Sequence, residues 1–439
     1  MSVKDRKEKD EMNETQKMNK NKWEGLKNST IRMDLGNFFK WLFFAVLIGL
    51  VVGAASTLFS YTLTFVTSFR TSHLWMFLGL PLAGVVIVFL YDRFGKNDGG
   101  VNQVFSSIRS RDNVPASSAP LIFVATALTH LTGGSAGREG AAIQLGGSIA
   151  NLIGKYFPLD EEDRHVIVMC GMSAAFAALF GTPMAAALFA LEVVSVGVMY
   201  YTALMPCMIA SLIASGFSAN MGVHAEAFHV SSIPEFNVVN GIKMGLVALA
   251  CALLSIIFCL TLKKTGELYK KYLKNKYVRV IVAAVLVIGI TCILQTTDYM
   301  GAGANLIVDA IEHGSVAPTA FIWKLLLTAI TMKAGFKGGE IVPAFSIGAT
   351  FGCVLGGLLG ISPSLAAACG MVAVFCGVTN CPLTATIIAF ELFGFEGAAF
   401  YVLAVAICYA TSDYYSLYKE QTIVYSKYKA KFVNQPTRM

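Results

Sequence analysis

Two ionisable side chains lie between clusters of glycine in an otherwise apolar part of the sequence. Arg138 and Glu139 occur in the stretch GGSAGREGAAIQLGG (133–147), which follows the apolar run 119–131. An ionisable group at membrane depth is costly and usually marks an ion or proton pathway. Glycine permits unusual backbone dihedrals, and the free N–H groups at a helix N-terminus attract negative charge. We therefore expect Glu139 to mimic an anion at a site built from backbone N–H groups.

The composition sets the surroundings of this site. Of the 439 residues, 55% are hydrophobic and only 14% are charged, and the mean hydropathy is +0.63. Segments such as 38–69 and 241–262 exceed the roughly 20 residues that cross a bilayer core. The sequence therefore predicts an all-α polytopic membrane protein in contact with lipid. The net charge of +7 is confined to the ends and a few loops, so a nucleic-acid partner is not expected.

No resident cofactor or metal is expected either. The ten cysteines lie in apolar segments, without a CxxC pair or a Cys/His pair at the spacing of metal ligands. We interpret them as small buried hydrophobic residues.

The apolar segments divide the chain into two long halves. Residues 36–219 form the first predicted transmembrane repeat, 220–240 a polar loop, and 241–415 the second repeat. The ends, 1–35 and 416–439, are expected as polar tails, the first of them flexible or helical at the surface.

Basic residues indicate the orientation of the chain in the membrane. They are concentrated in the N-terminal tail, in the loop 263–279 and in the C-terminal tail. Because cytoplasmic loops carry an excess of Lys and Arg, we expect all three on the cytoplasmic side of the plasma membrane.

The two halves repeat each other in sequence. The segment CGMSAAFAALFGTPMAAALFALE (170–192) matches CGMVAVFCGVTNCPLTATIIAFE (369–391), and both end in glutamate. Upstream, the stretch around Glu139 corresponds to GGEIVPAFSIGA around Glu340, so each half has a glycine-rich break with a central glutamate. Duplicated halves with broken helices are typical of transporters and channels whose site lies between the repeats. Close helix packing alone would explain the glycines but not the two glutamates.

These motifs resemble those of the CLC family of anion channels and proton-coupled anion exchangers. GREGA (137–141) is similar to the family's GREGP, whose gating and proton-carrying glutamate falls on Glu139. GGEIVP (338–343) is similar to the second filter motif GGxFxP, and GGVNQ (99–103) takes the place of the first filter loop. The resemblance implies two inverted halves with broken helices meeting at a central anion site, and a homodimer with one pore per subunit.

The residues that the resemblance places at the anion site lie in these glycine-rich loops and in one late tyrosine-rich segment. They are Gly99, Gly100, Val101, Asn102, Gly137, Arg138, Gly140, Glu340, Ile341, Val342 and Tyr415. For the central pore tyrosine, Tyr414, one register off, is the alternative to Tyr415.

Three departures from the chloride-type pattern bear on the transported ion. The first loop lacks the pore serine, the second filter motif carries Glu340, and the inner proton-transfer glutamate is replaced by Val193. Together they resemble the bacterial fluoride/proton antiporter branch. The first hypothesis is therefore a fluoride/proton exchanger that exports fluoride, and the second is a chloride-conducting channel or chloride/proton exchanger. An enzyme is not expected, because the sequence shows no nucleophile and base pair.

A single residue would couple the two ions in either exchanger. Ionised Glu139 competes with the halide for its site, and protonated Glu139 leaves that site. Like-charge repulsion from a bound anion favours protonation, so arrival of the anion and uptake of a proton favour one another.

Overall fold

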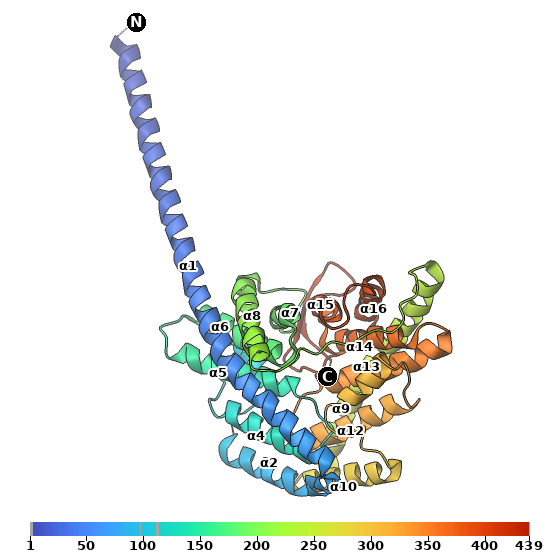
Figure 1. Ribbon diagram of the computed structural model, residues 1–439. Helices are drawn as coiled ribbons and strands as arrows, with labels where there is room; N and C mark the ends of the chain where they lie inside the picture. Colours follow the sequence, from blue (N-terminus) through green and yellow to red (C-terminus); the bar gives the residue numbers. More distant parts are fainter. Residues whose placement is uncertain (1–2, 97, 111–113, 439) are drawn as a thin grey trace.

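The computed structural model describes the backbone of residues 3–96, 98–110 and 114–438, with side chains from Leu35 onward. It is a bundle of helices (Figure 1), which confirms the predicted all-α fold. The first half contains α1 (Val3–Ser72), α2 (Leu80–Phe94), α3 (Val101–Arg109), α4 (Ser118–Leu131), α5 (Glu139–Lys155), α6 (Glu161–Phe180), α7 (Pro183–Glu192) and α8 (Leu204–Asn220). The second contains α9 (Val238–Tyr272), α10 (Lys276–Leu294), α11 (Ala304–Ile311), α12 (Ala320–Ala334), α13 (Ile341–Leu359), α14 (Pro363–Thr379), α15 (Pro382–Phe393) and α16 (Ala398–Thr411).

Within the described part of the chain, seven helical segments are long and apolar enough to cross a membrane. The segments within α6 and α13 are largely enclosed by other helices, whereas those of α2 and α10 are mostly exposed. This pattern places α6 and α13 at the centre and α2 and α10 at the periphery. The ten cysteines are free thiols, and nine are buried as expected. Cys292 is the exception, because it lies on the outward face of peripheral α10.

The same close helix contact occurs in both halves. Helix α5 packs on α6, and α13 packs on α14. A Cβ atom on Gly171 of α6 would lie 2.3 Å from the carbonyl oxygen of Gly146 of α5, and one on Gly370 would lie 2.4 Å from that of Gly348. These glycines therefore allow the backbones to touch, as in other membrane helix pairs with small residues at the interface.

Two glutamates at equivalent positions join the halves to each other. The Glu391 carboxylate, near the end of α15, accepts hydrogen bonds of 2.9 Å from the N–H groups of Met184 and Ala185 at the start of α7. The Glu192 carboxylate, at the end of α7, accepts from the N–H of Thr384 at 3.0 Å and from its hydroxyl at 2.7 Å. A carboxylate is favoured at a helix N-terminus, so each half caps a helix of the other.

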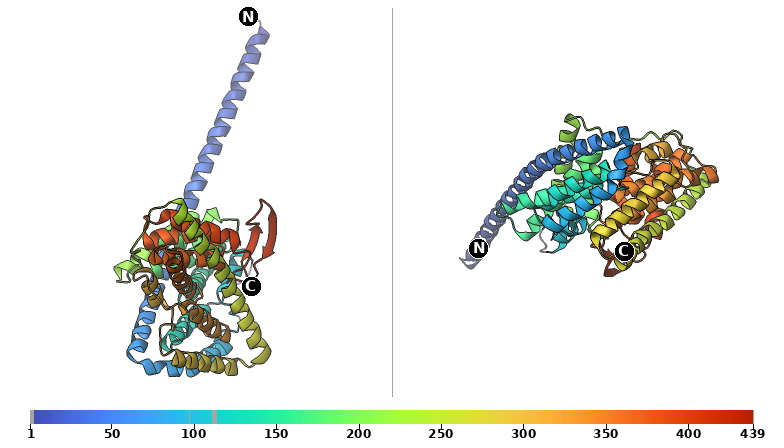
Figure 2. Two further views of the ribbon diagram at one scale, coloured as in Figure 1. Left: turned by 90° about the vertical axis from the view of Figure 1, so that its right-hand side faces the viewer. Right: turned by 90° about the horizontal axis from the view of Figure 1, so that it is seen from below.

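The ends of the chain differ from the expected tails. Helix α1 begins at Val3 and continues into the first membrane segment without a break, so the helical alternative holds for the N-terminal segment (Figure 1). The segment 416–439, predicted as a polar tail, contains two short strands. There β2 (Thr422–Tyr425) pairs in parallel with β1 (Ser195–Val196) and antiparallel with β3 (Phe432–Pro436), and the strands lie against one side of the helices (Figure 2).

A buried amide anchors this C-terminal segment. The Gln421 side chain is fully buried, and its Nε2 donates to the carbonyl oxygens of Val193 at 2.7 Å and Thr379 at 2.6 Å. These hydrogen bonds satisfy the buried carbonyl groups of Val193 and Thr379, which would otherwise be buried without a partner. They thereby hold the C-terminal segment against the bundle.

The α5–α6 contact gives a prediction for stability. We expect Gly171→Ala to lower the thermal midpoint of the detergent-solubilised protein by several degrees, because overpacking costs about 1–3 kcal/mol. Gly216→Ala in α8 is the matched control, since no atom lies within 4 Å of a Cβ built there. Equal midpoints for the two variants would contradict the close contact.

Candidate functional site

Glu139 lies at the first position of α5 and is fully buried. Its Oε2 accepts a hydrogen bond of 3.0 Å from the N–H of Val342, in the first turn of α13, and its Oε1 accepts one of 3.1 Å from the N–H of Arg138. The carboxylate thus occupies the N-terminus of a helix from the other half, as the sequence predicted for an anion mimic. Backbone N–H groups at such a position bind anions generally.

Two glycines shape the space around this carboxylate. Gly137 and Gly339 exchange backbone hydrogen bonds of 2.7 and 2.8 Å, which join the glycine-rich breaks of the two halves. A Cβ atom on Gly137 would lie 2.4 Å from Oε2 of Glu139, and one on Gly339 would lie 3.1 Å from it. Any other residue at Gly137 would therefore displace the carboxylate.

The start of α3 meets the same place. A Cβ built on Gly140 would lie 3.1 Å from Cα of Gly339 and 3.5 Å from the side chain of Val101. The N-terminal ends of α3, α5 and α13 therefore converge, and their dipoles all favour negative charge at the point where they meet.

The first filter loop is held by side chains that the sequence analysis did not single out. The N–H of Gly100 donates to Oδ1 of Asp98 at 2.8 Å, and the N–H of Gly99 donates to Oε1 of Gln103 at 2.8 Å. Asp98 also accepts from Nε2 of Gln144 at 3.0 Å. These two N–H groups, predicted to contact the anion, are thus already satisfied in this structure. The signal in the sequence that could have identified Asp98 is an acidic residue inside a glycine-rich loop.

The other loop residues connect the site to the C-terminal segment. Oδ1 of Asn102 accepts a hydrogen bond of 3.5 Å from the N–H of Glu420. Gly100 has a φ of +69°, which favours glycine, and it is the N-cap of α3. The loop therefore leads into the short helix α3, and Asn102 in the first turn of α3 is bonded to the C-terminal segment at Glu420.

Glu340 is the N-cap of α13, and Ile341 is its first residue. The Glu340 carboxylate is half-buried and forms an ion pair of 3.4 Å with Nζ of Lys333. In the first half the N-cap of α5 is Arg138, not Glu139. The expected equivalence of Glu139 and Glu340 is therefore off by one residue, because the hydrogen-bonded Gly137 and Gly339 set the register of the two helix starts. The repeat places opposite charges, Arg138 and Glu340, at matching positions.

The three tyrosines of the late segment have different surroundings. The hydroxyl of Tyr414 bonds to Ser426 of the C-terminal segment at 2.9 Å, and the half-buried Tyr415 pairs its backbone with Arg438. Tyr418 is buried and packs edge-to-face on Phe105 of α3 with ring centres 4.8 Å apart.

Tyr418 is thus the tyrosine of this segment that packs on α3, whose first residues form part of the first filter loop. The segment leaves α16 irregularly, and no periodicity in the sequence shows which of its three tyrosines turns inward.

A buried lysine close to the site was missed altogether. Lys324 of α12 is fully buried, and its Nζ donates to the carbonyl oxygens of Gly301 at 2.7 Å and Tyr299 at 3.2 Å and to the hydroxyl of Ser135 at 3.1 Å. A buried charge without a carboxylate in contact is costly, which distinguishes this lysine from the surface lysines of the loops.

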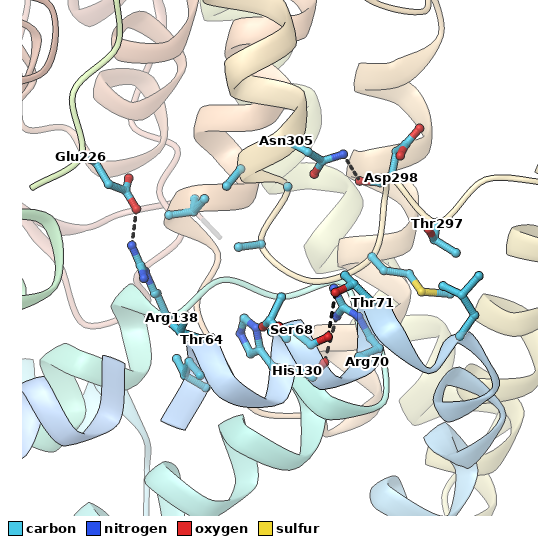
Figure 3. Close-up of a pocket in the computed structure, with 18 residues that line it drawn as sticks. Thr64, Ser68, Arg70, Thr71, His130, Arg138, Glu226, Thr297, Asp298 and Asn305 are labelled. Atoms are coloured by element: carbon cyan, nitrogen blue, oxygen red, sulfur yellow. Dashed lines mark hydrogen bonds and ion pairs between the residues drawn. The ribbon is translucent and has the colours of Figure 1, made fainter. Parts of the chain in front are cut away.

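A cavity of about 600 Å³ reaches this region from one side (Figure 3). Its lining includes Val342, whose N–H holds Glu139, and the side chain of Arg138, which pairs with Glu226 of the loop between α8 and α9. Arg70, at the end of α1, donates to the carbonyl oxygen of His130 at 2.8 Å on the opposite wall. The cavity is therefore lined by two arginines and by the residue whose N–H binds Glu139. In the part of the chain that the structure describes, no group of His, Cys, Asp and Glu is placed to hold a metal.

Comparison with known proteins agrees with this geometry. The model of the voltage gated chloride channel family matches residues 83–413. A "Chloride/fluoride channel protein" of Pseudomonas syringae pv. tomato is 35% identical over 397 residues, which cover 89% of this chain and 88% of the relative. The H(+)/Cl(-) exchange transporter ClcA of Vibrio cholerae is 24% identical over 390 residues, which cover 81% of this chain and 82% of that protein.

Solved structures give the same result. The crystal structure of a CLC-type fluoride/proton antiporter superposes with a TM-score of 0.85 at 33% identity and covers 88% of this chain and 98% of that one. A slow cyanobacterial Cl-/H+ antiporter shares the fold, with a TM-score of 0.74 at 17% identity and coverage of 85% and 94%. From the family match, the bacterial relative and the shared architecture, the chain belongs to the voltage-gated chloride channel (CLC) family of membrane transport proteins.

Proposed function

We propose that this protein exchanges fluoride for protons across the plasma membrane and so exports fluoride from the cell. The observation that carries the proposal is the Glu139 carboxylate at the N-terminus of α13, where it accepts from the N–H of Val342. A carboxylate and a halide would compete for those N–H groups. The similarity to a chloride/fluoride channel protein and to a fluoride/proton antiporter supports fluoride as the halide.

Exchange follows because one small site cannot hold both the ionised Glu139 carboxylate and a fluoride ion. When fluoride reaches the N–H groups, the repulsion between the two anions favours protonation of Glu139 and its departure from α13. When the fluoride leaves, the carboxylate loses its proton and returns. In the proposed cycle the proton is released toward the side from which the fluoride came, so each cycle moves an anion one way and a proton the other.

Glu340 supports fluoride over chloride. It caps the helix that holds the Glu139 carboxylate, and Lys333 is its ion-pair partner at 3.4 Å. A second carboxylate beside an anion site repels most halides unless it shares a proton with them. Fluoride is the halide most able to accept such a proton or a strong hydrogen bond.

The assembly and topology are part of the proposal. Helices α7, α8, α15 and α16 each expose a large apolar side chain, namely Met184, Leu212, Leu383 and Val402. These exposed side chains support a homodimer through this face, with one pore per subunit. The basic residues at the end of α9 and the start of α10 support cytoplasmic termini.

The first test concerns proton coupling. We expect Glu139→Gln to abolish proton uptake into liposomes under an outward fluoride gradient, because a neutral amide neither carries the proton nor mimics the anion. Glu396→Gln is the matched control, since Glu396 is exposed and distant in sequence from both filter motifs. Unchanged proton uptake in Glu139→Gln would remove this residue from the mechanism.

The second test concerns ion selectivity. We expect wild-type liposomes to pass fluoride in strong preference to chloride, measured with ion-selective electrodes. Glu340→Gln should reduce fluoride flux roughly tenfold, which corresponds to about 1.4 kcal/mol in the barrier, without changing elution of the folded protein in size-exclusion chromatography. Equal fluoride and chloride fluxes in the wild type would favour the alternative, a chloride channel or chloride/proton exchanger.

The third test concerns Lys324. If its ammonium group stabilises negative charge at the site, Lys324→Met should raise the fluoride concentration at half-maximal flux severalfold. Ser135→Ala is the control, because it removes one hydrogen-bond partner of Lys324 and keeps the charge. A similar effect of both substitutions would mean that Lys324 acts through its hydrogen bond to Ser135, and not by its charge.

A further inference from the structure

A second cavity, of about 620 Å³, lies apart from the first and is lined by four basic side chains. It is walled by α2, the start of α10 and the chain after α12. The basic residues of the lining are Lys96, Lys276, Arg279 and Lys337, and its acidic residues are Asp92 and Asp98. None of the lining residues belongs to the carboxylate site formed by Glu139 and Glu340.

Both carboxylates of the lining are already engaged. Asp92 forms an ion pair of 2.6 Å with Lys276. Asp98 accepts from Gln144 and from the N–H of Gly100. The excess positive charge of the cavity is therefore not balanced by its own acids.

The other three cations have no carboxylate within ion-pair distance among the described residues. Arg279 lines the cavity, and its Nε donates to the carbonyl oxygen of Ala334 at 2.9 Å. Nζ of Lys337 lies 4.1 Å from the ring centre of Tyr91, and Lys96 is exposed at the mouth. Such an arrangement suits an anion with oxygen atoms in several directions, as a phosphate group has.

The cavity lies at the lipid-facing edge of the bundle. Its walls α2 and α10 are the two membrane segments with the lowest buried share, 28% each. Ile87 and Val88 of α2 provide an apolar part of the lining below the charges. The basic side chains belong to the ends of helices that the positive-inside rule places in the cytoplasm. Basic pockets between membrane helices on that side bind the head groups of anionic lipids.

We propose that this second cavity binds the phosphate head group of an anionic phospholipid from the cytoplasmic leaflet. Lys96, Arg279 and Lys337 hold the phosphate oxygens, and the acyl chains extend along α2 and α10. A phosphate ion free in solution offers the same oxygens, but it makes no use of the apolar lining or of the position at the lipid-facing edge.

The bound lipid regulates the filter, because the cavity wall continues directly into both filter motifs. Asp98 precedes Gly99 in the chain and holds the N–H of Gly100, while Lys337 precedes Gly338. A phosphate that draws Lys337 from the Tyr91 ring also acts on the segment leading to Glu340. This regulatory part rests on the proposed fluoride exchange, whereas lipid binding does not.

Binding is tested on the purified full-length protein by native mass spectrometry. Phosphatidylglycerol should be retained at least about tenfold better than phosphatidylcholine by the wild type, a difference of roughly 1.4 kcal/mol. Arg279→Met, Lys337→Met and the exposed Lys96→Met should each weaken that retention, while Lys263→Met in α9, outside the cavity lining, should not. Equal retention in the three cavity variants and the Lys263 control would overturn the site.

Two further measurements test whether the bound phosphate group comes from a lipid and whether lipid binding changes fluoride flux. Inorganic phosphate at millimolar concentration should fail to displace bound phosphatidylglycerol, and displacement would overturn the assignment to lipid. Fluoride flux should be severalfold higher in vesicles that contain phosphatidylglycerol than in phosphatidylcholine vesicles, and Lys96→Met should remove this difference. Lipid retention without any effect of phosphatidylglycerol on measurable flux overturns the regulation alone. A protein that retains the lipid but transports no fluoride instead contradicts the proposed function.

Discussion

A carboxylate in the apolar interior of a membrane protein needs compensation, and the rest of this structure is arranged to supply it. Glu139 is fully buried and accepts hydrogen bonds from two backbone N–H groups, those of Arg138 and Val342. Such N–H groups exist only where a helix begins, because all later ones are bonded within the helix. The membrane helices must therefore be interrupted at the site. The same N–H groups would serve a small anion, which is how one site holds either a carboxylate or a halide.

Interrupted helices would weaken the bundle if each half were independent. The halves are instead joined by backbone hydrogen bonds between Gly137 and Gly339, and by Glu192 and Glu391, each of which caps a helix of the other half. Glycines let the backbones of α5 and α6, and of α13 and α14, come into direct contact, which keeps the helix starts close together. The precision of the carboxylate site thus depends on contacts far from it. A site on rigid elements is better defined than one on loops.

Charge near the site is distributed unequally between the halves. The N-cap of α5 is Arg138, which pairs with Glu226, and the N-cap of α13 is Glu340, which pairs with Lys333. The described hydrogen-bond partners of buried Lys324 are all neutral oxygen atoms. The duplicated backbone therefore carries an asymmetric set of charges.

The sequence by itself determined the features that depend on residue type and on local spacing. Long apolar segments predicted the membrane helices, the match of 170–192 with 369–391 predicted two related halves, and a charge among glycines marked Glu139. Tertiary structure alone decided the rest. Tyr418 packs on Phe105 of α3, and Gln421 and the C-terminal strands fix the path of that segment. Similarly, Arg138 and Glu340 occupy equivalent helix N-caps because the hydrogen bonds between the two halves set where each helix begins. Lys324 is held in place by hydrogen bonds to the distant loop that contains Gly301. Registers and buried partners of this kind arise from packing between distant segments, and no local pattern of residues encodes them.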